Sequence, residues 1–91
     1  MKKPTLLLIS MGELATHLLE AVARTDIFGT IVVASRELEK ARKRANNAVL
    51  GAGIEGFFPR IVAEKLDVHS ADFATRLREI NPDFIFSAPS L

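Results

Sequence analysis

The sequence predicts one α/β domain built on a doubly wound parallel sheet. Thr5–Ile9 and Thr30–Ala34 are short, continuous apolar segments, a pattern typical of strands that are buried on both faces of a sheet. Each is followed by a segment whose apolar residues recur at helical spacing. Strands that alternate with helices form parallel sheets through right-handed crossovers. With 91 residues, of which 48% are hydrophobic, the chain is long enough for one core.

The first half of the chain contains two expected helices. The first covers Glu13–Thr25, and the residues expected on its inner face are Leu14, Leu18, Ala21 and Val22. The second follows Ser35, a good N-cap residue, and covers Glu37 to about Asn47. Charge pairs at helical spacing support this second helix, namely Glu37–Lys40 and Glu39–Lys43.

The second half contributes a further helix between two strands. A third strand lies within Arg60–Val68 and a fourth at Phe84–Phe86. Between them, Ser70 is expected to cap a helix that ends at Ile80, since Pro82 cannot continue it. The expected strand order is 3-2-1-4, with three helices, and it makes the fourth strand an edge.

The composition of the fourth strand indicates contacts with another chain. Phe84, Ile85 and Phe86 are apolar on both faces, and the strand has no charged residue or proline of the kind that protects an exposed edge. We therefore expect self-association through residues 84–87 or through the apolar surface beside them.

Composition excludes several classes of function. Twelve Lys and Arg against eleven Asp and Glu leave a net charge of +1, without the basic excess of nucleic-acid-binding modules. The absence of cysteine excludes disulfides, thiolate metal sites and cysteine nucleophiles. The apolar segment after Lys2 and Lys3 is too short for a signal peptide or a membrane span. A cytoplasmic protein without a metal site or a membrane contact is expected.

Two glycine clusters compete as a phosphate-binding loop. Residues 51–56 match the spacing G-x-G-x-x-G, but no helix follows them, so we interpret them as a plain connection before the third strand. Residues 10–15 lead from the first strand into the first turn of a helix, where helix N-terminal N–H groups can bind a pyrophosphate. The predicted loop consists of Ser10, Met11, Gly12, Glu13, Leu14 and Ala15. Gly12 would allow close approach of the backbone, and Ala15 close packing of the helix on the first strand.

The end of the second strand indicates which dinucleotide is bound. An acidic residue about 20 positions after the glycine loop binds the ribose hydroxyls of NAD. Here Ala34 stands at that position, followed by Ser35 and Arg36. A hydroxyl and a guanidinium suit the 2′-phosphate of NADP, and Lys40 lies one helical turn further on. The sequence therefore favours NADP, with NAD as the alternative cofactor.

These motifs resemble the amino-terminal half of a Rossmann domain, most closely that of the saccharopine dehydrogenase-like family. The segments that carry the resemblance are Leu7–Ala15, Ile31–Ala41, Leu66–Val68 and Asn81–Pro89. The resemblance implies that Asp67 and Val68 flank the adenine. It also implies that Ser87, Ala88 and Pro89 lie by the nicotinamide ribose of an oxidoreductase. This sequence departs from the family pattern at Ser10, which stands where the tight-turn glycine usually lies.

A dinucleotide-binding fold has two β-α-β-α-β halves, and this chain supplies little more than one. Residues 1–91 are therefore expected to be a single domain, the amino-terminal fragment of a longer enzyme, without turnover of its own. No catalytic residue is predicted. His17 is expected on the helix surface or packed against the sheet, and His69 is expected in a solvent-facing loop. The alternatives are a non-enzymatic nucleotide-sensing module or a fragment similar to short-chain dehydrogenases, although their Tyr-x-x-x-Lys pair is impossible in a chain without tyrosine. A response-regulator-like domain would need acidic residues after the first strand, where Ser10–Gly12 stands.

Overall fold

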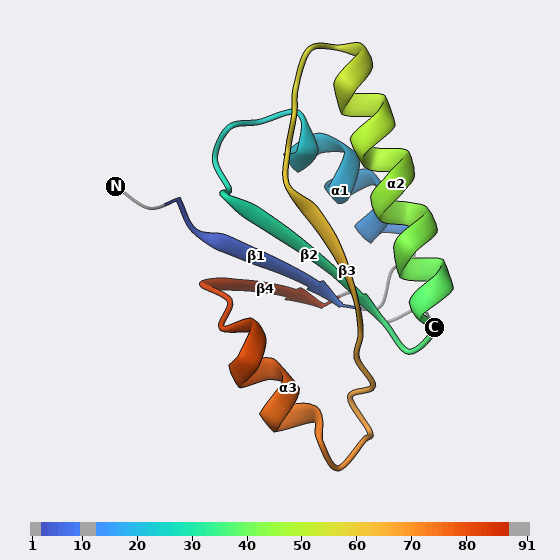
Figure 1. Ribbon diagram of the computed structural model, residues 1–91, viewed down its shortest axis with the longest axis vertical. Helices are drawn as coiled ribbons and strands as arrows, with labels where there is room; N and C mark the ends of the chain where they lie inside the picture. The colour runs from blue at the N-terminus through green and yellow to red at the C-terminus, as the bar shows by residue number, and fades with distance from the viewer. Residues whose placement is uncertain (1–2, 10–12, 88–91) are drawn as a thin grey trace.

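The computed structural model describes residues 3–9 and 13–87 of the chain. Over these residues strands and helices alternate (Figure 1): β1 (Thr5–Ile9), α1 (Glu13–Ala23), β2 (Thr30–Ser35), α2 (Leu38–Ile54), β3 (Ile61–Lys65), α3 (Phe73–Ile80) and β4 (Phe84–Ser87). The strands form one parallel sheet in the order β3-β2-β1-β4. The predicted Rossmann-like α/β arrangement and its strand order are confirmed.

Helices α1 and α2 cover one face of the sheet, and α3 covers the other (Figure 1). On the first face, Leu6 and Leu8 of β1 pack with Ile31 and Val33 of β2. The buried residues that α1 adds are Ala15, Leu19 and Ala23, and those of α2 are Ala41, Ala45, Ala48 and Ala52. Because α2 buries alanines, its backbone lies close to the layer beneath it.

The opposite face has a thinner cover. Its buried residues are Leu7, Ile9, Val32, Ala34 and Leu66. Helix α3 packs on them through Phe73, Leu77 and Ile80, each of which stays half-buried. A helix of eight residues spans only part of this face.

Strand β4 is an edge, as predicted. It pairs with β1 in the register Leu7–Ile85. Just before β4, the Asp83 N–H donates to the Thr5 carbonyl of β1 at 2.9 Å. The Asp83 carboxylate in turn accepts the Thr5 N–H, with Oδ2 at 2.7 Å from the nitrogen. Phe84 and Ile85 remain 57% and 52% exposed, whereas Phe86 packs against the α1–α2 core.

The first helix differs in detail from the expectation. Helix α1 ends at Ala23 rather than Thr25, and the Thr25 hydroxyl donates to the Val22 carbonyl after the last turn. Its buried positions repeat every four residues, at Ala15, Leu19 and Ala23. Leu18 and Val22 therefore lie at the flank of the buried stripe, and Ala21, expected to face inward, is exposed.

Neither expected serine is an N-cap. The N-cap of α2 is Glu37 and that of α3 is Asp72, and both lack a capping side-chain hydrogen bond. Ser70 instead closes a turn ahead of α3, where its hydroxyl donates to the Asp72 carboxylate. On α2, Glu37 pairs with Lys40 at 3.1 Å as predicted, whereas Glu39 pairs with Arg42 at 3.1 Å.

The glycine-rich segment before β3 is not the plain connection that we expected. Helix α2 continues through Gly51 and Gly53 to Ile54. Gly56 then has a φ of 88°, and its N–H donates to the Gly53 carbonyl while the Phe57 N–H donates to that of Ala52. This pair of bonds is the Schellman motif, which ends a helix on a left-handed glycine. Residues 51–56, which match G-x-G-x-x-G, thus form the C-terminal end of α2.

Candidate functional site

The carboxyl ends of the four strands meet at one edge of the sheet, where open α/β sheets bind ligands. Ile9 of β1 is the register partner of both Ala34 of β2 and Ser87 of β4. Strand order reverses between β1 and β4, so this is the topological switch point. The predicted loop residues Ser10, Met11 and Gly12, and Ala88 and Pro89 beyond β4, lie outside the described residues.

The end of β2 presents Ser35 and Arg36 at this edge. Ala34 is buried, so no carboxylate occupies the position where NAD-binding sheets place one. The Ser35 carbonyl accepts the Leu66 N–H at 2.8 Å, which holds the ends of β2 and β3 together. Its hydroxyl oxygen accepts the Glu37 N–H at 3.3 Å, and the hydroxyl proton remains able to donate to a ligand. The Arg36 side chain is exposed.

Positive charge gathers beside Ser35. Lys65, the last residue of β3, is the register partner of Ser35 and is exposed. Lys65 was not predicted as a site residue, because strand register is not a local property of the sequence. Lys40, which was predicted near the phosphate, already pairs with Glu37. The N-terminus of α2 begins two residues after Arg36, and its partial positive charge also favours an anion.

Asp67 and Val68 follow β3 at the same edge. The Asp67 carboxylate accepts the His69 N–H at 2.9 Å, and the backbone carbonyl of Asp67 accepts the Ser70 N–H at 3.0 Å. The carboxylate therefore holds the turn that leaves β3. Val68 is 44% exposed and offers apolar surface beside that turn.

The remaining predicted site residues lie at or near the start of α1 and the end of β4. Ala15 is fully buried in the α1–α2 core, as close helix packing on β1 requires. Glu13 and Leu14 begin α1, and Ser87 is the exposed last residue of β4. The structure thus brings Ser35, Asp67 and Ser87 to one edge of the sheet.

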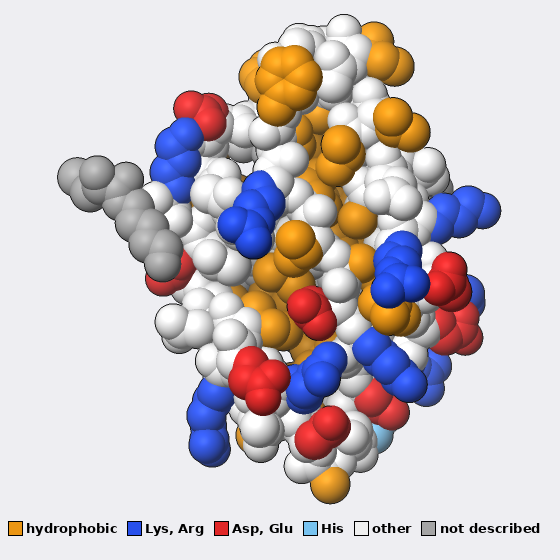
Figure 2. All heavy atoms as spheres, in the orientation of Figure 1, with side chains coloured by type: hydrophobic (Ala, Val, Ile, Leu, Met, Phe, Trp, Pro, Cys, Tyr) orange, Lys and Arg blue, Asp and Glu red, His pale blue; other side chains and the backbone are white. Residues whose placement is uncertain are grey.

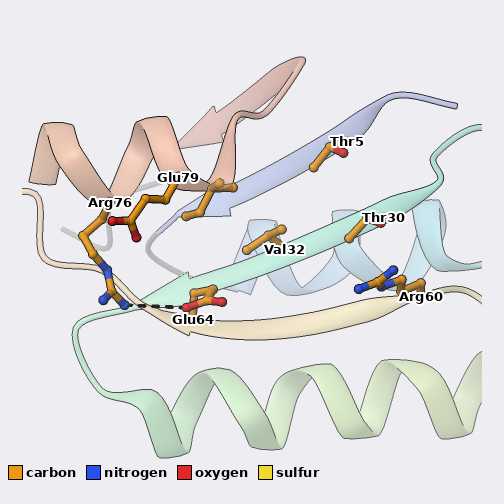
Figure 3. Close-up of a pocket in the computed structure, with 8 residues that line it drawn as sticks. Thr5, Thr30, Val32, Arg60, Glu64, Arg76 and Glu79 are labelled. Carbon is orange, nitrogen blue, oxygen red and sulfur yellow. Dashed lines mark ion pairs between the residues drawn. The ribbon is translucent and has the colours of Figure 1, made fainter. Parts of the chain in front are cut away.

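A polar groove of about 410 Å³ lies on the α3 face and runs along the sheet from the strand starts to Glu64 near the end of β3 (Figure 3). The sheet side of the groove is lined by Thr5, Thr30, Val32 and Glu64, with Arg60 just before β3. The α3 side is lined by Arg76, Glu79 and Ile80. Arg76 lies 3.6 Å from the Glu64 carboxylate and donates to the Lys65 carbonyl at 3.2 Å, so it ties α3 to β3. Arg76 was not predicted as a site residue, although Glu64, a charged residue after three apolar ones in β3, was an available signal.

The two histidines are exposed. His17 lies on the surface of α1 rather than against the sheet, and His69 lies in the turn after β3 as expected. Across residues 3–9 and 13–87, no three His, Cys, Asp or Glu residues gather closely enough to hold a metal ion. Within the same ranges, none of the helices combines the length and apolar character needed to cross a membrane.

No protein-family model and no curated protein matches the chain. It is similar in structure to protein Rv1636 from Mycobacterium tuberculosis H37Rv, with a TM-score of 0.62 and 11% identity over 97% of this chain and 72% of that one. It is also similar to MGS-M5, a lactate dehydrogenase enzyme from a Medee basin deep-sea metagenome library. That similarity has a TM-score of 0.65 and 12% identity, and covers 98% of this chain and 39% of the enzyme. At these identities the similarity shows a shared fold.

Proposed function

We propose that the chain binds a nicotinamide dinucleotide at the carboxyl edge of its sheet, with NADP preferred to NAD. The observation that carries the proposal is the end of β2, where exposed Arg36 follows Ser35 and buried Ala34 replaces a carboxylate. An arginine guanidinium binds phosphate through two parallel hydrogen bonds. A ribose that carries a 2′-phosphate therefore fits this corner better than one with two free hydroxyls.

The surroundings of Arg36 also suit a phosphate. The hydroxyl of Ser35 can donate to it, and Lys65 stands in register beside Ser35. The first turn of α2 adds N–H groups and the positive end of the helix dipole. Glu37 opposes an anion, but its carboxylate is 3.1 Å from the Lys40 ammonium. In this arrangement Val68 would contact the adenine, and the segment around Gly12 would approach the pyrophosphate.

The enzymatic part of the proposal is a cofactor domain of an oxidoreductase of the saccharopine dehydrogenase-like type. The sequence resemblance supports it, and the structural similarity to a lactate dehydrogenase supports the broader oxidoreductase class. When bound, the nicotinamide supplies the hydride chemistry. The residues of this chain would bind and orient the dinucleotide.

The test compares two small probes that need no nicotinamide contacts, adenosine 2′,5′-bisphosphate and adenosine 5′-monophosphate. Charge-assisted hydrogen bonds contribute about 1.5–3 kcal/mol, and exposure reduces this toward the lower end. We expect the bisphosphate to bind roughly tenfold more tightly. Arg36→Ala should remove most of that preference, and NADPH should exceed NADH in the same way in calorimetric titrations.

Arg60→Ala is the matched control, because Arg60 is also exposed, carries the same charge and lies before β3, at the amino ends of the strands. It should leave the preference for the 2′-phosphate intact. Equal affinity of the parent chain for the two probes would contradict NADP selectivity. An Arg60→Ala variant as impaired as Arg36→Ala would show that net charge alone, and not the corner at β2, attracts the phosphate.

A further inference from the structure

The two edges of the sheet are protected differently. At the β3 edge, Glu64 and Lys65 lie within the strand and Arg60 precedes it, and such charges oppose the addition of another strand. The β4 edge has Phe84, Ile85, Phe86 and Ser87, with no charge among them. Hydrogen bonds to β1 occupy one side of β4, so alternate N–H and C=O groups face outward on the other side. Such a row of groups is a template for pairing with another strand.

Apolar side chains border the open backbone of β4 on both faces of the sheet. Phe84 and Phe86 point to the α1–α2 face, where Phe84 meets the ring of Phe28 edge-on at 6.2 Å. Ile27, next to Phe28 in the chain, is 60% exposed. By strand alternation Ile85 points to the α3 face, and it is 52% exposed. A partner strand therefore needs apolar side chains on both of its faces.

We propose that a second copy of this chain occupies the edge, with the two β4 strands antiparallel around a twofold axis at Ile85. Phe84-Ile85-Phe86 reads the same in both directions, so each Phe84 lies opposite Phe86 of the second copy on one face. Each Ile85 lies opposite its own equivalent on the other face. The contact is self-complementary, as twofold interfaces require. A net charge of +1 on each copy opposes association only weakly.

The twofold axis makes a sharp test. Directly opposite Cβ atoms in an antiparallel pair are about 4.5–5.5 Å apart, so Ile85→Lys or Ile85→Glu places two like charges together. Each variant alone should keep the 10.0 kDa mass of one chain at concentrations where the parent shows twice that mass in analytical ultracentrifugation. An equimolar mixture of the two variants should recover the doubled mass, because lysine then faces glutamate.

The matched control is Ile54→Lys. Apolar side chains also gather at the end of the molecule where α2 finishes (Figure 2), and Ile54 there is 86% exposed. This variant should associate like the parent. Ile85→Thr, which keeps a β-branched residue in the strand, should fold and raise the dissociation constant roughly tenfold. Circular dichroism checks the fold of each variant.

Three results would overturn the proposal. The first is a parent chain that keeps the mass of one chain at every concentration. The second is loss of association in Ile54→Lys but not in Ile85→Lys. The third is a lysine and glutamate mixture in which folded variants fail to recover the doubled mass, since that outcome excludes the twofold axis at Ile85. None of these results depends on nucleotide binding.

Discussion

Two glycines at the end of α2 should respond oppositely to the same substitution. Gly53 lies inside the helix, and a Cβ built on it meets no atom within 4 Å. Alanine there removes backbone freedom from the unfolded chain and should stabilise the fold by about 0.5–1 kcal/mol. Gly56 has a φ of 88°, and an L-residue in that region costs about 1–2 kcal/mol. In a domain of this size 1 kcal/mol corresponds to about 4–8 °C in Tm.

Thermal melts followed by circular dichroism, together with urea titrations, measure both effects. Gly53→Ala should raise Tm by roughly 2–8 °C, and Gly56→Ala should lower it by roughly 4–16 °C. Urea titrations should show the same signs in the midpoint with unchanged slopes. Two shifts of the same sign would refute the assignment of Gly53 to the helix interior or of Gly56 to its left-handed end.

Two further predictions concern the start of β4 and the predicted phosphate loop. Asp83→Ala removes the carboxylate that accepts the Thr5 N–H at 2.7 Å and should cost about 1 kcal/mol in urea unfolding, while Asp83→Asn, which keeps an acceptor oxygen, should cost less. An alanine variant as stable as the parent would count against that bond. Gly12→Val should abolish dinucleotide binding in calorimetry without changing the circular dichroism spectrum, since a branched side chain would fill the space that the pyrophosphate needs. Unchanged affinity would place the phosphate loop elsewhere.

The strands were predictable because each is a short apolar segment between polar or glycine-containing ones. Thr5–Ile9 begins and ends as predicted, and β2 and β4 each extend one residue further, to Ser35 and Ser87. Strand order followed from right-handed crossovers together with the pattern of alternating strands and helices. These properties are local or nearly so, and they also located Ser35, Arg36 and Asp67 near the carboxyl edge.

Helix ends depended on contacts that the sequence pattern does not reveal. Gly51 and Gly53 each disfavour a helix by about 1 kcal/mol, which suggested an end near Asn47. Burial of Ala48 and Ala52 against the first face of the sheet offsets that cost and carries α2 to Ile54. Lys65 could not be predicted for a similar reason, because its position beside Ser35 depends on the register between β2 and β3.

The position of β1 between β2 and β4 has a consequence for the order in which the protein assembles. Thr5 and Asp83, which join β1 to the start of β4, are 78 positions apart. At a synthesis rate of about 5–20 residues per second, β4 is synthesised ~4–16 s after β1, so the β4 side of β1 stays unpaired for that time. Until then the nascent chain holds a three-stranded sheet whose open border is β1, its most apolar strand. Closure of that border joins the most distant parts of the chain, which makes it the step that we expect to limit the folding rate.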